Sequence, residues 1–138
     1  MSNEFYLDEF IPKSLYLDEY SDYQLKMLID YRLVNVCQQL RNRFGPLTIN
    51  DWYIHGDRNW SGLRTPGSPY YSLSSQHSWG RAVDVISNKY HPEEMREEIR
   101  KHYNVYHFLG VTRIERDVNW LHFDLGYSGI DTLMEFSA

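Results

Sequence analysis

The stretch Ser75-Gln76-His77-Ser78-Trp79-Gly80-Arg81-Ala82-Val83-Asp84-Val85-Ile86 decides the fold, because it runs from a long polar loop into an apolar strand. The loop, over residues 55–79, is rich in Gly, Ser, Pro and Asn, and loops of that length inside a compact domain usually carry function. Alternation along the strand sends Ala82, Asp84 and Ile86 to one face and the two valines to the other. A carboxylate therefore lies inside an apolar strand.

Asp84 needs a partner, because an ionised carboxylate buried among apolar side chains is costly unless a cation or a metal ion neutralises it. The sequence leaves two explanations open. One is a structural ion pair with Arg81 or Arg113, and the other is a metal ion that Asp84 binds together with histidines.

A second strand is predicted in Asn119-Trp120-Leu121-His122-Phe123-Asp124-Leu125. Alternation places its leucines and its phenylalanine on one face, expected to be the core, and Trp120, His122 and Asp124 on the other. If this strand lies beside that of Asp84, His122 and Asp84 become cross-strand neighbours with Cβ atoms about 5 Å apart. That distance suits two ligands of one metal ion.

His77 completes a candidate metal site, since it arrives from the loop before the first strand. Two histidines and one aspartate form the ligand set of a tetrahedral zinc site whose fourth position is left for water. An open site of this kind lowers the pKa of bound water and polarises a carbonyl group, which is the chemistry of amide hydrolysis. The other histidines lack a strand-borne acid and are expected at the surface or in packing: His55, His91, His102 and His107.

Hydrophobic periodicity predicts the elements around these segments. Apolar residues recur three or four apart over residues 21–44, which is typical of a core-facing helix, with Ser21 or Asp22 to cap its start and Gly45-Pro46 to end it. The further elements expected are a strand over 47–53, the strand over 82–86, a helix over 92–103 and strands over 111–115 and 119–125. The predicted fold class is α+β, a small mainly antiparallel sheet with helices packed on one face and the zinc site on the sheet.

Length and composition limit the organisation of the chain. Its 138 residues suit one domain, and 42% hydrophobic with 24% charged residues are typical of a folded globular protein. Residues 1–20 are interpreted as an N-terminal arm with aromatic anchors that packs on the domain or on a partner, and residues 21–138 as a single zinc peptidase-like domain.

Charge and hydropathy exclude several function classes. The formal net charge is -5, so the cationic surface that binds nucleic acid or anionic lipid is lacking. No apolar run approaches the ~20 residues that span a bilayer, and the N-terminus has neither the basic nor the apolar region of a signal peptide. We therefore expect a protein made in the cytoplasm, without a membrane span and without nucleic acid as a partner. The single cysteine, Cys37, is expected to be a small buried hydrophobe.

Three motifs together carry a family resemblance. They are S-x-H-x-x-G-x-A-x-D over residues 75–84, W-x-H-x-D over residues 120–124 and Ser-Gly-Leu-Arg-Thr at residues 61–65. In this order and spacing they resemble the zinc D-alanyl-D-alanine carboxypeptidases and their relatives, a group that includes phage L-alanyl-D-glutamate endolysins and the zinc fold of the hedgehog signalling domain. The resemblance extends over residues 25–125, three quarters of the chain.

The resemblance implies a role for each matching residue. The positions of the zinc ligands correspond to His77, Asp84 and His122. Arg64 corresponds to the arginine that holds a substrate carboxylate or carbonyl group, a task suited to a planar guanidinium. Ser75 and Trp120 are candidate substrate-binding residues. A solvated loop arginine, a turn-forming serine and a core tryptophan would look the same in the sequence.

Several residues near the predicted site could serve as the general base. Many relatives carry an acid three residues before the final zinc histidine, where this chain has Asn119, which cannot accept a proton. Glu115 is our first candidate, because a hairpin turning over residues 116–119 would place it opposite Trp120 and on the face of His122.

Two other acids are near enough in the sequence to be considered for the same role. Asp124 is expected to orient a ligand histidine or the substrate rather than to take a proton. Asp117 lies at the tip of the predicted turn and is expected only to form that turn.

These features favour a zinc metallopeptidase that hydrolyses a peptide bond in bacterial peptidoglycan stem peptides, as a D,D-carboxypeptidase or an endopeptidase. Without a signal peptide, such an enzyme would reach the cell wall after release or inside a particle, which points to a phage or prophage origin. One alternative is a catalytically weak or inactive zinc-binding structural protein that docks on a virion or on itself through residues 5–20. Another is a metal-free domain.

Overall fold

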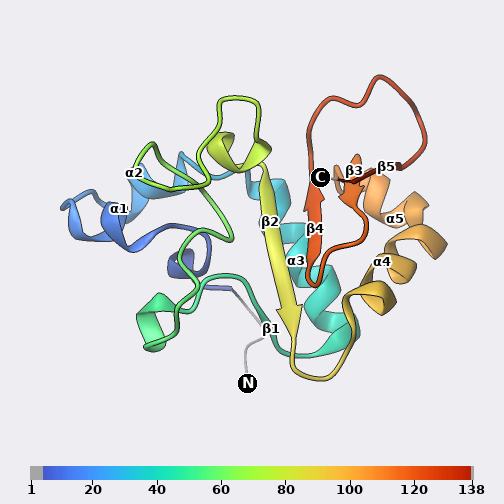
Figure 1. The fold of residues 1–138 in the computed structure, drawn as a ribbon, viewed down its shortest axis with the longest axis horizontal. Coiled ribbons are helices and arrows are strands. Elements are labelled where there is room, and N and C mark those ends of the chain that lie inside the picture. The colour runs from blue at the N-terminus through green and yellow to red at the C-terminus, as the bar shows by residue number, and fades with distance from the viewer. Residues whose placement is uncertain (1–4, 138) are drawn as a thin grey trace.

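The computed structural model describes residues 5–137. Five strands form one small open sheet in the order β1-β2-β4-β3-β5 (Figure 1). Their bounds are β1 Leu47–Thr48, β2 Ala82–Ser87, β3 Arg113–Glu115, β4 Leu121–Asp124 and β5 Met134–Phe136. Neighbouring strands are antiparallel except β3 and β5, which are parallel, so the sheet is mixed.

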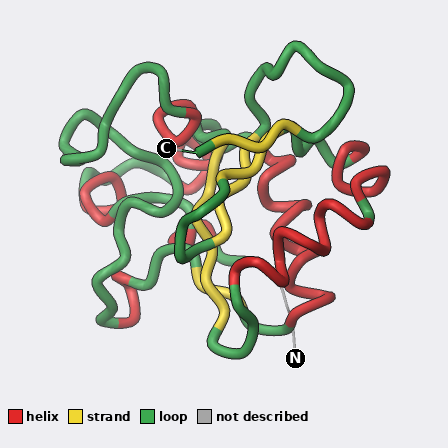
Figure 2. Tube along the Cα trace, turned by 45° about the vertical axis from the view of Figure 1, so that its right-hand side comes forward, coloured by secondary structure: helices red, strands yellow, loops and turns green. Residues whose placement is uncertain are grey.

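The longer helices lie on one side of the strands, and loops with short helical turns lie on the other (Figure 2). The longer helices are α3 Tyr31–Phe44, α4 Pro92–Lys101 and α5 Tyr103–Phe108. The short elements are η1 Leu7–Glu9, α1 Lys13–Leu17, α2 Asp22–Lys26, η2 Trp52–Ile54 and η3 Gln76–Trp79. The α+β class is confirmed, while the parallel β5 was not predicted.

One apolar core lies between the sheet and α3, α4 and α5. β2 contributes Val83 and Val85, and β4 contributes Leu121 and Phe123, all of them fully or almost fully buried. The helices contribute Leu33, Val36, Cys37, Leu40, Phe44, Met95, Ile99 and Tyr106. The faces predicted for both strands are therefore confirmed, and so is the burial of Cys37.

The predicted single helix over residues 21–44 is wrong, because the chain bends between α2 and α3. Asp30 starts a new helix there: its carboxylate accepts a hydrogen bond from the backbone N of Arg32 at 3.0 Å. The backbone N of Asp30 also donates to the carbonyl of Gly80 at 2.9 Å. The bend thus ties the start of α3 to the end of the turn that carries His77.

The predicted stop and start signals of this region are confirmed at the ends of the two helices. Ser21 caps α2, since its hydroxyl accepts from the backbone N of Gln24 at 3.2 Å. Gly45, at φ +78°, ends α3. The predicted helix over residues 92–103 ends earlier than expected, at Lys101, and α5 begins two residues later.

The predicted strand over residues 47–53 is wrong beyond its first two residues. Only Leu47 and Thr48 pair with β2, and the chain then turns toward the N-terminal segment. The side chain of Asn50 donates to the carbonyl of Ile11 at 3.0 Å, and its backbone N donates to the carbonyl of Glu9 at 3.1 Å. These bonds replace the sheet pairing that the apolar pattern predicted.

The described part of the predicted N-terminal arm packs on the rest of the domain. Phe10 and Ile11 are buried, and the carbonyl of Phe10 accepts from the backbone N of Leu63 at 2.8 Å. Residues 1–4 of the predicted arm lie outside the described residues. Within residues 5–137, no helix combines the length and the apolar character needed to cross a membrane.

Candidate metal centre

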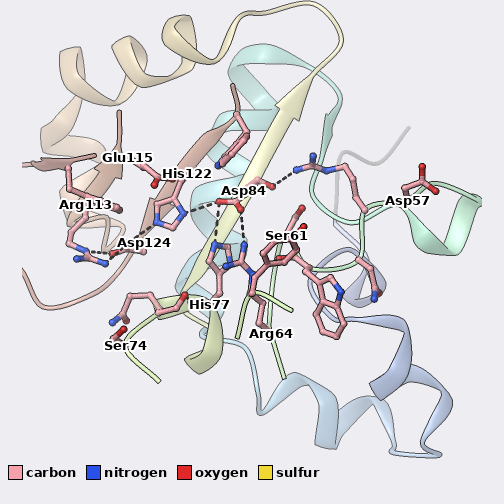
Figure 3. Close-up of a pocket in the computed structure, with 18 residues that line it drawn as sticks. Asp57, Ser61, Arg64, Ser74, His77, Asp84, Arg113, Glu115, His122 and Asp124 are labelled. Carbon is pink, nitrogen blue, oxygen red and sulfur yellow. Dashed lines mark hydrogen bonds and ion pairs between the residues drawn. The ribbon is translucent and has the colours of Figure 1, made fainter. Parts of the chain in front are cut away.

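Three potential metal ligands meet on the face of the sheet that points away from α3 (Figure 3). His77 comes from η3, Asp84 from β2 and His122 from β4. Asp84 and His122 are cross-strand partners, as predicted. One ligand atom from each residue lies within 4.8 Å of the others, and all three residues are buried. This group could hold a metal ion.

His77 is fixed by the short helical turn in which it lies. The hydroxyl of Ser75 accepts from the backbone N of His77 at 3.3 Å and so caps η3. Nδ1 of His77 donates to the carbonyl of Gly62 at 2.9 Å, which leaves Nε2 to face Oδ1 of Asp84 at 3.3 Å. Gly80 ends the turn at φ +69°, and a Cβ there would collide with the carbonyl of Leu28.

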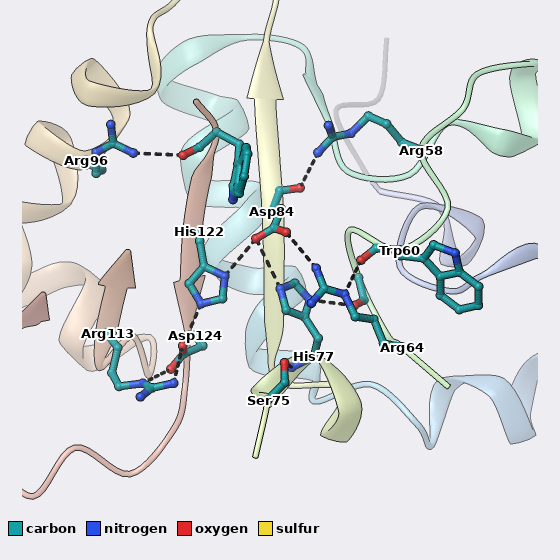
Figure 4. A network of polar contacts seen from close by, with 12 residues as sticks. Arg58, Trp60, Arg64, Ser75, His77, Asp84, Arg96, Arg113, His122 and Asp124 are labelled. Carbon is teal, nitrogen blue, oxygen red and sulfur yellow. Dashed lines mark hydrogen bonds and ion pairs between the residues drawn. The ribbon is translucent and has the colours of Figure 1, made fainter. Parts of the chain in front are cut away.

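Asp84 is the centre of the polar network (Figure 4). Its Oδ1 lies 2.9 Å from Nδ1 of His122, and its Oδ2 accepts from Nη2 of Arg64 at 3.2 Å. Burial alone would raise the pKa of Asp84, but the hydrogen bonds from His122 and His77 outweigh burial and hold the pKa below its ordinary value. The carboxylate is therefore ionised at neutral pH.

Asp84 pairs with neither Arg81 nor Arg113, so the two ion pairs considered from the sequence are not formed. Arg81 pairs with Asp30 at 3.5 Å, and Arg113 pairs with Asp124 at 2.8 Å. The cation beside Asp84 is Arg64 instead.

His122 is held from both of its ring nitrogens. Nδ1 faces Asp84, and Nε2 donates to Oδ2 of Asp124 at 2.8 Å. Burial opposes a charge on His122, but Asp124 and Asp84 together raise the pKa of the imidazole to about 9. Asp124 thus fixes the orientation of the His122 ring and leaves Nδ1 as the nitrogen nearest His77 and Asp84.

Asp124 is itself locked in place, with a fully buried side chain. Nε and Nη2 of Arg113 donate to its two oxygens at 2.8 and 2.9 Å, and the backbone N of Gly126 donates at 3.0 Å. Burial opposes ionisation of Asp124, but the bonds from His122 and Arg113 lower its pKa. All of its hydrogen-bonding directions are used, so Asp124 is poorly suited to accept a proton.

The candidate metal-binding group of His77, Asp84 and His122 lies in a cleft of about 670 Å³. One wall comes from the loop before η3 and includes Ser61 and Arg64. The other wall includes Glu115 and Trp120, and Ser75 also lines the cleft. Ser75 and Trp120, the other two candidate substrate-binding residues, therefore line the cleft together with Arg64. The hydroxyl of Ser75 also caps η3.

Arg64 is not a solvated loop arginine, since its side chain is only 17% exposed. Its Nε donates to the carbonyl of Trp60 at 2.8 Å, its Nη2 to Asp84, and its guanidinium lies 5.5 Å from the ring centre of Tyr70. These contacts aim a cation into the cleft beside the candidate metal ligands.

Glu115 lines the cleft, but its register differs from the prediction. β3 pairs with β4 through Arg113 and Asp124, so the same register continued would place Glu115 opposite His122 and not opposite Trp120. A shift of two residues leaves the face unchanged, because side chains alternate with a period of two. Among the described residues, the side chain of Glu115 makes no hydrogen bond or ion pair, in contrast to those of Asp84 and Asp124.

The other two positions discussed for the base lie outside the cleft. Asp117 is exposed, has φ +63° and accepts from the hydroxyl of Ser137 at 3.2 Å. Asn119 is exposed and does not line the cleft. Of the remaining histidines, none lines the cleft, and His91 caps α4 through a bond from the backbone N of Glu93 at 3.1 Å.

Two residues around His122 were not predicted from the sequence as part of the site. Arg113 was considered only as a partner of Asp84, although its position two residues before Glu115 puts both side chains on one face of the strand. Phe136 packs against His122 with ring centres 5.6 Å apart, and it lies on β5, which no periodicity predicted. Three residues of Met134–Phe136 are too few for a pattern to form.

Two imidazole nitrogens and one carboxylate oxygen are a donor set that suits zinc and related transition metals better than magnesium or calcium. The residues present therefore fit the metal that the motifs imply, and each ligand has a hydrogen bond or an ion pair that fixes its direction. Comparison of the chain with protein-family models, with curated proteins and with solved structures gives no match.

Proposed function

We propose that this protein is a zinc-dependent peptidase that hydrolyses a peptide bond in bacterial peptidoglycan stem peptides. One observation carries the proposal: three ligand atoms from η3, β2 and β4 meet in a cleft that also holds Arg64 and Glu115. The motif resemblance to zinc D-alanyl-D-alanine carboxypeptidases supplies the substrate class. A phage or prophage origin, with action on the wall after release, belongs to the same proposal.

His77 Nε2, Asp84 Oδ1 and His122 Nδ1 would hold the metal, because these atoms face one another. When bound, Zn²⁺ would polarise a substrate carbonyl and lower the pKa of a water molecule toward neutrality. Asp124 and Gly62 hold the far nitrogens of the two imidazoles, so the ligands are directed before any ion arrives.

Arg64 binds an oxygen of the substrate in this proposal. Nε and Nη2 are engaged by Trp60 and Asp84, which holds the guanidinium plane in place. A planar, permanently charged group of this kind recognises carboxylate and carbonyl oxygens with directional hydrogen bonds. In a D,D-carboxypeptidase that oxygen would belong to the terminal carboxylate, and in an endopeptidase to a carbonyl.

Glu115 acts as the general base in this proposal. Its carboxylate lines the cleft and makes no hydrogen bond or ion pair among the described residues, so it can accept a proton from the attacking water at a carboxylate oxygen. The same carboxyl group then returns the proton to the leaving amine. Asp124 is the alternative base, but its bonds to Arg113, His122 and Gly126 disfavour that role.

A specific observation supports the second candidate, a zinc-binding structural or virion protein of low activity. Tyr6, Tyr16, Leu17 and Tyr20 of the N-terminal segment are between 49% and 73% exposed, which is a large apolar area for a surface. In this alternative, residues 5–20 dock on a virion or on a second copy, and Glu115 is dispensable.

Hydrolysis of a synthetic stem pentapeptide ending in D-alanyl-D-alanine tests the proposal, with products identified by mass spectrometry. We expect cleavage by the zinc-loaded protein, loss of cleavage with a chelator and recovery on adding zinc. Purified wall fragments extend the assay to endopeptidase cleavage. Zinc bound in full with no cleavage of either substrate would reject the peptidase and favour the structural alternative.

A further inference from the structure

The cleft wall carries a second arginine, Arg58, to which the proposed mechanism gives no role. Arg58 belongs to the same loop as Arg64, lines the cleft and is half-buried. Its Nε donates to the backbone carbonyl of Ile49 at 2.8 Å, and its Nη2 donates to the backbone carbonyl of Asp84 at 3.3 Å (Figure 4). Two neutral acceptors therefore hold this guanidinium beside a candidate metal ligand.

No carboxylate among the described residues forms an ion pair with the guanidinium of Arg58. Asp51 and Asp84 attract it electrostatically, but the carboxylate of Asp51 accepts from the backbone N of Arg58 at 2.8 Å, and that of Asp84 is engaged by Arg64 and the two histidines. Asp57, the preceding residue, is exposed and makes no ion pair. A cation withdrawn from water without a paired anion is costly.

Arg58 differs in this respect from the other arginines of the chain. All of them except Arg116 form an ion pair with a carboxylate among the described residues, and Arg116 is exposed to water. Nη1 of Arg58 makes no hydrogen bond, and it is not one of the buried polar atoms that lack a partner, so solvent reaches it. A carbonyl or hydroxyl group could accept from Nη1, but only an anion would also balance the charge.

We propose that Arg58 binds a carboxylate group of the peptide substrate, an inference that rests on the proposed peptidase function. A stem peptide offers one carboxylate at its C-terminus and another on its internal glutamate. Asp84 balances the charge of Arg64 at 3.2 Å, whereas the charge of Arg58 is paired only when the peptide is bound. The cleft therefore selects stem peptides that carry this carboxylate over their amidated forms.

The test measures the affinity of three pentapeptides by isothermal titration calorimetry. They are the unmodified stem pentapeptide, its C-terminal amide, and a form in which the side-chain-linked glutamate is replaced by isoglutamine. The zinc-loaded Glu115→Gln protein is used so that the peptides stay intact, with and without Arg58→Gln. Glutamine keeps an N–H donor for a backbone carbonyl and removes the charge. Arg116→Gln, which removes an arginine outside the cleft, is the matched control.

Arg58→Gln should weaken binding of the unmodified pentapeptide by about tenfold or more, as expected for a lost hydrogen bond between charged groups, with zinc content unchanged. The amidated peptide that lacks the partner carboxylate should bind equally well to the proteins with and without Arg58→Gln. The other amidated peptide should keep the full difference, so the pair of peptides identifies the carboxylate. Arg116→Gln should leave the affinities nearly unchanged, because salt screens an exposed charge.

Two results overturn the inference and leave the peptidase proposal intact. One is an unchanged affinity of Arg58→Gln for the unmodified pentapeptide. The other is an equal loss of affinity for all three peptides, which would show that Arg58 only supports the loop through its bonds to Ile49 and Asp84. If the Glu115→Gln protein binds no pentapeptide and the unchanged protein hydrolyses none, the proposed function and this inference are rejected together.

Discussion

Oδ1 of Asp84 lies 2.9 Å from Nδ1 of His122 across the antiparallel pair of β2 and β4. The contact joins two residues that are 38 positions apart in the chain, and both are buried on the face opposite the core. Because a metal ligand set requires unprotonated nitrogen and ionised oxygen atoms in proximity, this pair is the basis of the candidate site.

Asp124→Asn is expected to weaken zinc binding by about 10- to 100-fold, the range found for groups that orient metal-bound histidines. The amide can keep one bond from Arg113 but no longer balances the charge on both of its neighbours. Competition with a chromophoric chelator measures the affinity. Asp117→Asn, a change at an exposed turn residue, is the matched control, and equal affinities in the two variants would contradict the role given to Asp124.

Glu115→Gln is expected to lower kcat for stem-peptide cleavage by at least about 100-fold, because the amide cannot take a proton from water. Zinc content and the thermal unfolding temperature should stay close to those of the unchanged protein, since the Glu115 side chain has no hydrogen bond or ion pair to lose among the described residues. Steady-state cleavage of the pentapeptide and elemental analysis are the two measurements. Full activity in this variant would show that another residue is the general base.

Asp30→Ala is expected to reduce the free energy of unfolding by about 1 kcal/mol, because α3 loses its N-cap. Asp30→Asn should cost less, since an amide oxygen still accepts from the backbone N of Arg32. Urea unfolding at neutral pH compares the three proteins, and identical midpoints for Asp30→Ala and the unchanged protein would exclude the cap.

The N-cap Asp30 should also make the stability of the protein depend on pH. Hydrogen bonds from Arg32 lower the pKa of Asp30 below its ordinary value. Stability from the ionised form is therefore present above the unfolded pKa of about 4 and is lost as the pH falls through the lower folded pKa. The advantage of the unchanged protein over Asp30→Asn should shrink on acidification below about pH 4. A difference that grows with acid would contradict the assignment.

Cys37 is expected to resist thiol reagents in the folded protein. Burial raises its pKa well above the ordinary value, so the reactive thiolate is scarce, and the side chain is enclosed by the core. Ellman's reagent should react fully in denaturant and at a rate limited by unfolding in buffer. Immediate reaction of the folded protein would show that α3 does not pack as described.

The ligands of the candidate site could be predicted because strands impose a strict alternation. Asp84 and His122 each lie at a known parity relative to apolar neighbours, and parity survives errors in strand bounds, as the register of Glu115 illustrates. The α+β class followed from the same patterns.

The helix and the strand that were predicted wrongly are segments whose structure depends on tertiary contacts. Periodicity continues through residues 27–30, yet Asp30 bonds to Gly80 and starts a new helix there. Asn50 leaves the sheet because it pairs with Ile11, a residue 39 positions earlier. The Arg113–Asp124 pair was missed for a related reason, since opposite charges on neighbouring strands reveal their pairing only once the register is known.

Zinc stoichiometry most directly tests the claim that these three side chains bind one cation. Elemental analysis would be made on the protein purified with zinc and then dialysed, beside His77→Ala and His122→Ala, with His107→Ala as a histidine control outside the cleft. The account predicts about one zinc ion per chain in the unchanged protein and in His107→Ala, and almost none in the other two. Equal zinc in all four proteins, or none in any, would contradict it.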